Sequence, residues 1–212
     1  MVGFLFDLDG VIIDTESEYS KIWKKINEEF PSGIIGLEEK IKGTTLDNIL
    51  ITYYPDEKMR QQVADRLHEL EGKMQYKYCP GAYEFLNNLS KNNLPKVLVT
   101  SSDNEKMKNL FLQLPELKHS FDYIITAEQV KTSKPDPEGY LLGANKIGIK
   151  PENCIVFEDS LQGVKAGKAA SAYVIGIEGT FTSEQLSEYS DIIKDNLSDI
   201  DIQDLIEKVS IR

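Results

Sequence analysis

Cysteine and histidine are scarce in this sequence. The 212 residues contain two of each. With only His68 and His119 available, we expect neither a Ser-His-Asp triad nor a histidine-rich metal site. Cys79 and Cys154 lack the spacing of metal ligands, so we expect them to be free thiols in a reducing compartment.

The sequence also has few positively charged residues and no long apolar run. Asp and Glu number 35 against 24 Lys and Arg, which gives a formal net charge of -11. No dense Lys/Arg block points to a nucleic-acid partner. No apolar run approaches the roughly 18 residues of a membrane span, and no basic stretch with an apolar core precedes the first strand-like segment. We therefore expect a cytoplasmic monomer that binds neither nucleic acid nor membranes.

Strand-like and helical segments alternate through most of the chain. The segments expected as strands are residues 4–6, 96–101, 123–126, 154–158, 173–177 and 191–193. The amphipathic segments that follow or separate them are residues 82–92, 103–113, 136–148, 160–170, 183–188 and 200–209. This alternation predicts an α/β fold with a doubly wound parallel sheet of Rossmann-like type.

Residues 15–79 interrupt this alternation. Their apolar side chains recur at helical spacing over 17–30, 46–53 and 57–76. We therefore expect a small all-helical cap domain, inserted after the first strand into a core domain made of residues 1–14 and 80–212. Short linkers near residues 13–16 and 77–81 would let the cap hinge as a lid.

The first strand ends in two aspartates, Asp7 and Asp9, which are followed by Gly10. Residues i and i+2 of a strand point to the same face, so both carboxylates can address one spot. Sheets of this kind bind ligands beyond the carboxyl ends of their strands. A divalent cation such as Mg²⁺, which prefers oxygen ligands, would offset the repulsion between the two aspartates. The alternative is an ordinary acidic loop or an Asx turn before the glycine.

Three further strand ends carry groups suited to phosphate chemistry. Thr100-Ser101-Ser102-Asp103 follows one strand, Lys134 lies in a proline-stiffened loop after the next, and Glu158-Asp159-Ser160 ends a third. Hydroxyls and the N–H groups of a helix N-terminus bind phosphate. Each piece has an ordinary alternative: a helix N-cap for the serines and aspartates, or a surface position for the lysine. Their combination at four strand ends of one sheet favours a phosphate site.

These motifs resemble those of the haloacid dehalogenase superfamily. The resemblance rests on the run DLDGVIIDTE, on Thr100-Ser101, on Lys134-Pro135 and on Glu158-Asp159-Ser160, in that order. It is strongest to the phosphatase and β-phosphoglucomutase-like branch, which has a helical cap after the first strand. The implied enzyme is a phosphoric monoester hydrolase that hydrolyses small phosphate esters, sugar phosphates foremost.

The resemblance also implies a role for each matching residue. Asp7 would be the nucleophile that carries the phosphoryl group as an aspartyl phosphate. Asp9 would act as general acid and base. Thr100 and the Ser101 N–H would bind the phosphoryl oxygens, and Lys134 would neutralise both nucleophile and phosphate.

Mg²⁺ is the implied cofactor. Its ligands would come from Asp7, the main-chain carbonyl of Asp9, and Asp159, with Glu158 bound directly or through water.

Three other functions compete with this one. A sugar-phosphate mutase needs a second phosphate clamp, and β-phosphoglucomutase-like sequences carry an arginine for it in a G-x-S-R pattern. This chain has Gly43, Thr44, Thr45 and Leu46 there, so a hydrolase is favoured; these four cap residues are expected to help select the substrate. The resemblance implies that a metal-free dehalogenase lacks the second aspartate, so Asp9 argues against that function. A non-enzymatic phospho-ligand binding protein would not need all four strand ends intact.

Overall fold

The computed structural model describes residues 1–41 and 46–211, which form two compact units. The sheet unit comprises Met1–Asp14 and Tyr76–Arg212, and the helical unit comprises Thr15–Gln75. The helical unit thus ends at Gln75, whereas the sequence suggested residue 79. The reason lies in backbone hydrogen bonds, because the N–H of Asp14 donates to the carbonyl of Lys77 and that of Cys79 donates to the carbonyl of Ile12, each at 2.9 Å.

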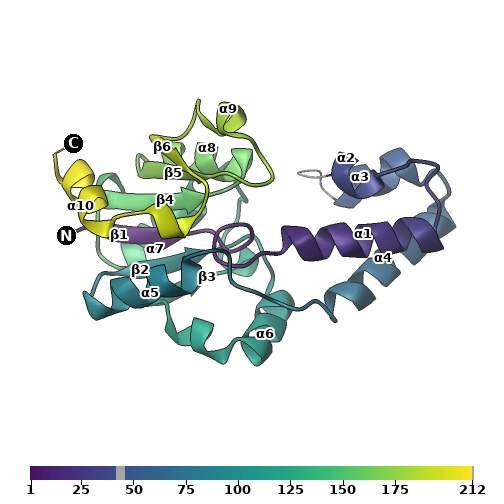
Figure 1. Cartoon of the computed structure of the whole chain (residues 1–212), viewed down its shortest axis with the longest axis horizontal. Helices are drawn as coiled ribbons and strands as arrows, with labels where there is room; N and C mark the ends of the chain where they lie inside the picture. The colour runs from purple at the N-terminus through teal and green to yellow at the C-terminus, as the bar shows by residue number, and fades with distance from the viewer. Residues whose placement is uncertain (42–45, 212) are drawn as a thin grey trace. The chain divides into compact units, whose positions relative to one another are not determined.

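Six parallel strands form the sheet of the first unit (Figure 1). They are β1 Gly3–Phe6, β2 Lys96–Val99, β3 Tyr123–Ile125, β4 Cys154–Glu158, β5 Tyr173–Ile177 and β6 Ile192–Lys194. Their order across the sheet is β3-β2-β1-β4-β5-β6. The strand order reverses between β1 and β4, which is where doubly wound sheets bind their ligands. The predicted α/β fold with a doubly wound parallel sheet is confirmed.

Helices cover both faces of this sheet. The α-helices are α5 Ala82–Lys91, α6 Asn104–Gln113, α7 Glu138–Lys146, α8 Leu161–Ala169, α9 Ser183–Leu186 and α10 Ile202–Ser210. On one face α7 packs on β1, β2 and β3 while α8 packs on β4 and β5, over a core that includes Leu5 and Val156. Phe6 points the opposite way from Leu5, and its ring stacks on Phe157 at 4.5 Å and meets Phe85 of α5 edge-on. Short 3-10 helices complete the unit at Pro115–His119, Ala127–Gln129, Pro151–Asn153 and Leu197–Asp199.

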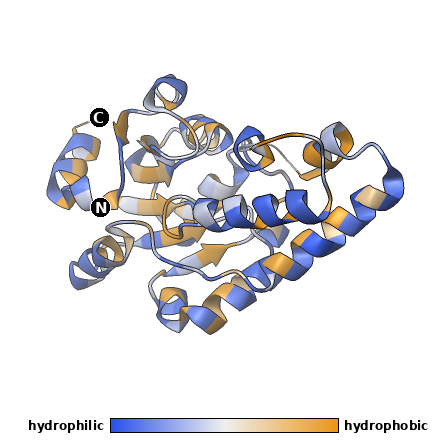
Figure 2. Ribbon diagram, turned by 45° about the vertical axis from the view of Figure 1, so that its right-hand side comes forward, coloured by the Kyte–Doolittle hydropathy of each residue, from blue (hydrophilic) through white to orange (hydrophobic). Residues whose placement is uncertain are grey.

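The helical unit consists of α1 Glu16–Glu29, α2 Leu37–Lys40, α3 Leu46–Tyr53 and α4 Glu57–Glu71. Figure 2 shows hydrophobic and hydrophilic residues recurring in turn along its helices. The apolar stripes are buried, with Ile22, Trp23 and Ile26 on α1 and Val63, Leu67 and Leu70 on α4. Arg66 of α4 also donates to both carboxylate oxygens of Glu29 at the end of α1. The unit is therefore held together mainly by its own small core.

Several element boundaries differ from the sequence-based expectation. The short helix α2 was not expected, and α4 ends at Glu71 instead of residue 76 because Gly72 forms its C-cap. Strand β2 ends at Val99, so Thr100 and Ser101 lie beyond it. The helix expected from residue 136 begins at Glu138, and the N–H of Glu138 donates to the carboxylate of Asp136 at 2.9 Å.

Among the helices in the described part of the chain, none has the length and apolar character that crossing a bilayer requires. Cys79 and Cys154 are both free thiols, as expected.

Candidate active site

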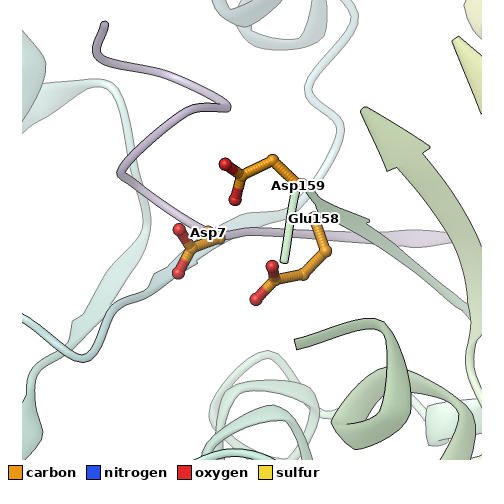
Figure 3. A group of neighbouring side chains, drawn as sticks. All are labelled: Asp7, Glu158 and Asp159. Carbon is orange, nitrogen blue, oxygen red and sulfur yellow. The ribbon is translucent and has the colours of Figure 1, made fainter. Parts of the chain in front are cut away.

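Three carboxylates converge at the carboxyl ends of β1 and β4. Oxygen atoms of Asp7, Glu158 and Asp159 lie within 4.8 Å of one another, and Figure 3 shows the three side chains directed towards a common space. Glu158 is fully buried, and Asp7 and Asp159 are each only 8% exposed. Buried carboxylates at such short distances repel one another, so the cluster is suited to binding a cation.

Strand register explains why these side chains meet. Phe6 of β1 pairs with Phe157 of β4, and the N–H of Asp7 extends the ladder by donating to the carbonyl of Phe157 at 3.0 Å. Asp7 and the pair Glu158-Asp159 therefore lie at the carboxyl ends of neighbouring parallel strands at the same level of the sheet, beyond the paired residues Phe6 and Phe157. The sequence-predicted acidic groups of these two strand ends are thus brought together.

Two glycines provide the space that the carboxylates occupy. A Cβ added at Gly10 would lie 2.0 Å from a carboxylate oxygen of Asp159, and Gly10 also has a left-handed φ of +73°. A Cβ added at Gly163 in α8 would lie 1.8 Å from the carboxyl group of Glu158. Any larger residue at either position would displace the adjacent acid, so these glycines are part of the site's construction.

Lys134 is the cation that the structure supplies to the cluster. Its ammonium group donates to Asp7 Oδ1 at 2.5 Å, to Glu158 Oε1 at 2.6 Å and to the carbonyl of Val99 at 3.1 Å. Burial alone would lower the pKa of Lys134, but the charges of Asp7 and Glu158 outweigh it and raise that pKa above its ordinary value. Lys134 is thus a fixed positive charge between two acids, and not a surface lysine. The Lys134–Pro135 peptide bond is cis.

Glu158 is surrounded by hydrogen-bond donors. Besides Lys134, the hydroxyl of Tyr140 donates to Oε1 at 2.7 Å, and the N–H and hydroxyl of Ser160 donate to Oε2 at 3.2 and 3.0 Å. Its two oxygens therefore each accept two hydrogen bonds. This pattern is typical of a carboxylate that orients neighbouring groups, here the lysine.

The electrostatic environment disfavours the charged form of Asp7. The pKa of Asp7 is raised from 3.8 to about 7: burial is the largest cause, Glu158 and Asp9 act in the same direction, and Lys134 opposes them. One ammonium group is therefore not enough to stabilise a carboxylate here. A divalent cation would lower the pKa of Asp7 again.

The expected phosphate ligands lie at the end of the neighbouring strand. Thr100 is buried and its hydroxyl accepts the N–H of Ser102 at 3.0 Å, while Ser101 is exposed. A cavity of about 190 Å³ is lined by Thr100, Ser101 and Lys134, together with the loop 131–133. The structure thus places these three predicted residues around one space.

The carboxylate of Asp9 is bound on the α6 side of the site. Lys106 donates to both of its oxygens, at 2.7 and 2.8 Å, and the hydroxyl of Ser102 donates to Oδ2 at 3.1 Å. Burial alone would lower the pKa of Lys106, but the charge of Asp9 raises it above its ordinary value. Asp9 is therefore not one of the three carboxylates that converge in Figure 3.

The helical unit contains a cavity of its own. Of the four expected substrate-selecting residues, Gly43, Thr44 and Thr45 lie outside the described residues, while Leu46 lines this cavity. Its volume is about 270 Å³, and its lining residues are Glu16, Tyr19, Ser20, Trp23, Glu38, Ile41, Leu46, Ile49, Leu67 and Glu71. The hydroxyl of Tyr19 donates to Glu71 at 2.9 Å. The cavity therefore combines an apolar wall with carboxylates and hydroxyls.

Two residues of the site were not found by sequence reasoning. Tyr140 falls on the buried stripe of α7 and looks like an ordinary core residue. Lys106 looks like a surface lysine, although one signal was available. It lies in the first turn of a helix, where the helix dipole disfavours a positive charge, so a local acidic partner could have been suspected.

Comparison with known proteins gives consistent matches. The sequence model of a family described as haloacid dehalogenase-like hydrolase matches residues 4–177. Hexitol phosphatase A of Escherichia coli is 29% identical, over 94% of this chain and 93% of the relative. Glycerol-1-phosphate phosphohydrolase 1 of Saccharomyces cerevisiae is 32% identical, over 91% and 81%. The solved structure of β-phosphoglucomutase from Clostridium difficile is 27% identical and superposes with a TM-score of 0.75, over 100% of this chain and 98% of that one.

Proposed function

Since the chain belongs to the haloacid dehalogenase-like hydrolase family, we propose that it is a Mg²⁺-dependent phosphatase of small phosphate esters, sugar phosphates foremost. One observation carries the proposal: Lys134 joins Asp7 to Glu158, in a cluster of three buried carboxylates at the strand ends. Phosphoryl transfer depends mostly on positioning and on charge stabilisation, and this cluster supplies both.

The residues fit a divalent metal. Asp7 and Asp159 offer hard carboxylate oxygens, and the main-chain carbonyl of Asp9 is a further candidate ligand. Glu158 already accepts four hydrogen bonds, which favours a contact through water over direct ligation. When bound, Mg²⁺ would neutralise charge on the nucleophile and on the phosphoryl group.

The proposed reaction has two steps. Asp7 attacks phosphorus and forms an aspartyl phosphate, while Lys134 balances the charge and Thr100 with the Ser101 N–H holds the phosphoryl oxygens. Asp9 gives its proton to the leaving oxygen in this step. It then takes a proton from the water that hydrolyses the intermediate.

The lining of the cavity in the helical unit suits an uncharged, hydroxyl-rich group. Three carboxylates, those of Glu16, Glu38 and Glu71, line it, and the described residues around it include neither lysine nor arginine. Carboxylates accept hydrogen bonds from sugar hydroxyls but repel a second phosphate. The named relatives are hexitol phosphatase A and glycerol-1-phosphate phosphohydrolase 1, and hexitols and glycerol are both polyols.

A β-phosphoglucomutase-type mutase remains the second candidate, because one of the similar structures carries that name. Leu46, which stands where such sequences carry the arginine of the second phosphate clamp, provides no charge. A non-enzymatic phospho-ligand binding protein is a weaker third candidate.

Two assays separate these functions. In the first, phosphate release is measured over a panel of hexose, hexitol and glycerol phosphates, with Asp7→Asn as the inactive control. In the second, the protein receives β-glucose 1-phosphate, Mg²⁺ and a trace of the bisphosphate. We expect free phosphate without isomerisation. Glucose 6-phosphate appearing much faster than free phosphate would establish the mutase function. If no ester were turned over, the non-enzymatic phospho-ligand binding protein would be the one candidate left.

We also infer that the enzyme acts as a cytoplasmic monomer without nucleic-acid or membrane partners. A net charge of -11 supports this, because an acidic surface repels phosphate backbones and anionic lipids. Size-exclusion chromatography with light scattering tests the monomer.

A further inference from the structure

The carboxylate of Asp9 has a cationic partner of its own. Lys106 contacts both oxygens of Asp9, and Ser102 contacts one of them. The side chain of Lys106 is only 20% exposed and that of Asp9 is 34% exposed, so this pair is better protected from solvent than an ordinary surface ion pair. Three hydrogen bonds to one carboxylate fix its orientation.

The stability of α6 does not explain this lysine. Lys106 lies in the first turn of α6, where the N-cap Asp103 accepts its backbone N–H at 2.8 Å. A positive side chain at this end opposes the helix dipole and weakens the helix by about 0.3–1 kcal/mol. The contact with Asp9 gives the cation at this position a partner of opposite charge.

We propose that Lys106 is a positioning residue that holds the carboxylate of Asp9 in the orientation required for proton transfer. The inference rests on the proposed function. In the structure, the ammonium group of Lys106 donates to both carboxylate oxygens of Asp9.

The two reaction steps need Asp9 to different degrees. In the first, the bond from Asp7 to phosphorus forms, the bond from phosphorus to the leaving oxygen breaks, and that oxygen takes a proton from Asp9. In the second, Asp9 takes a proton from water, the water oxygen bonds to phosphorus, and the bond to Asp7 breaks. A nitrophenolate leaves without a proton, whereas an alkoxide does not. With an aryl phosphate, only the second step therefore depends on Asp9.

This difference provides a kinetic signature for Lys106. Losing the orientation of Asp9 should slow both steps for an alkyl phosphate, but only hydrolysis of the aspartyl phosphate for 4-nitrophenyl phosphate. The variant should then release one equivalent of nitrophenolate per site at close to the wild-type rate constant, followed by a slow steady state. A merely structural defect that lowers the fraction of active protein would reduce the burst amplitude and the steady-state rate in the same proportion.

The test compares Lys106→Met with wild type by stopped-flow nitrophenolate release and by steady-state phosphate release from glycerol 1-phosphate. Lys108→Met, an exposed lysine of the same helix, is the matched control. We expect Lys106→Met to lower both steady-state rates by about tenfold to hundredfold, a part of what general acid–base catalysis supplies. The nitrophenolate burst should persist. Lys106→Arg, which keeps the charge, should recover most of the loss.

Two results would overturn the proposal: unchanged steady-state rates in Lys106→Met, or a loss without the fast first phase. If Lys106→Met does not fold, the same measurement on Lys106→Gln decides the question. Failure of the proposed function would look different, because the wild-type protein itself would then release no phosphate or would keep activity in Asp7→Asn.

Discussion

Replacing Asp7 by asparagine should abolish turnover and, without metal, make the folded protein more stable. The amide cannot act as the nucleophile, so activity should fall to below about a hundredth of the wild-type rate. The asparagine side chain has nearly the shape of a protonated aspartate. The substitution therefore mainly removes the negative charge that burial and the neighbouring acids disfavour. The fold should therefore survive the loss of function.

The pH dependence of this stability difference follows from the pKa of Asp7. That pKa is 3.8 in the unfolded chain and about 7 in the folded protein, so folding favours the protonated form. Below pH 3.8 the Asp7 carboxyl is neutral in both the folded and the unfolded protein, so wild type and Asp7→Asn should be equally stable. As the pH rises to about 7 the wild type loses stability, by at most about 4 kcal/mol, since each unit corresponds to about 1.4 kcal/mol. For a chain of 212 residues each kcal/mol shifts the Tm by about 2–4 °C.

Calorimetry in a chelator, at about pH 4 and about pH 8, measures this difference. The exposed carboxylate of Asp195 provides a matched control, because Asp195→Asn removes the same charge outside the site. Adding Mg²⁺ at the higher pH should raise the Tm of the wild type much more than that of Asp7→Asn. The reasoning would be refuted if Asp7→Asn were less stable than wild type at the higher pH, or if it kept more than about a hundredth of the activity.

Three further predictions concern the metal, the glycine and the tyrosine of the site. Activity should require Mg²⁺ and be inhibited by Ca²⁺, whose longer bonds and higher coordination number spoil in-line geometry; full activity in excess chelator would contradict this. Gly10→Ala should weaken Mg²⁺ binding and turnover by displacing Asp159, whereas Gly33→Ala, at a similar φ of +78° but with open space around it, should only lose stability; calorimetric Mg²⁺ titration distinguishes the two. Tyr140→Phe should lower the free energy of unfolding by about 1.5–3 kcal/mol in urea titrations, because it removes a hydrogen bond to buried Glu158; an unchanged midpoint would show that this bond is not stabilising.

The sequence alone determined the fold class and the location of the site. Period-two and helical apolar patterns distinguish the strands from the helices, and their alternation leaves a parallel doubly wound sheet as the natural outcome. In such a sheet the carboxyl ends of neighbouring strands lie at one edge, so the sequence is enough to assign Asp7, Thr100, Lys134 and Asp159 to one site. Local pattern and chain topology were sufficient for this inference.

Only the tertiary structure decided which side chains bond to which. The three acceptors of Lys134, the contact of Tyr140 with Glu158 and that of Lys106 with Asp9 join segments far apart in the chain. Such pairs depend on how α6 and α7 pack on the sheet and on individual rotamers, neither of which leaves a periodic signal in the sequence. The structure also placed residues 76–79 with the sheet unit, because backbone hydrogen bonds, which any residue can make, hold them there.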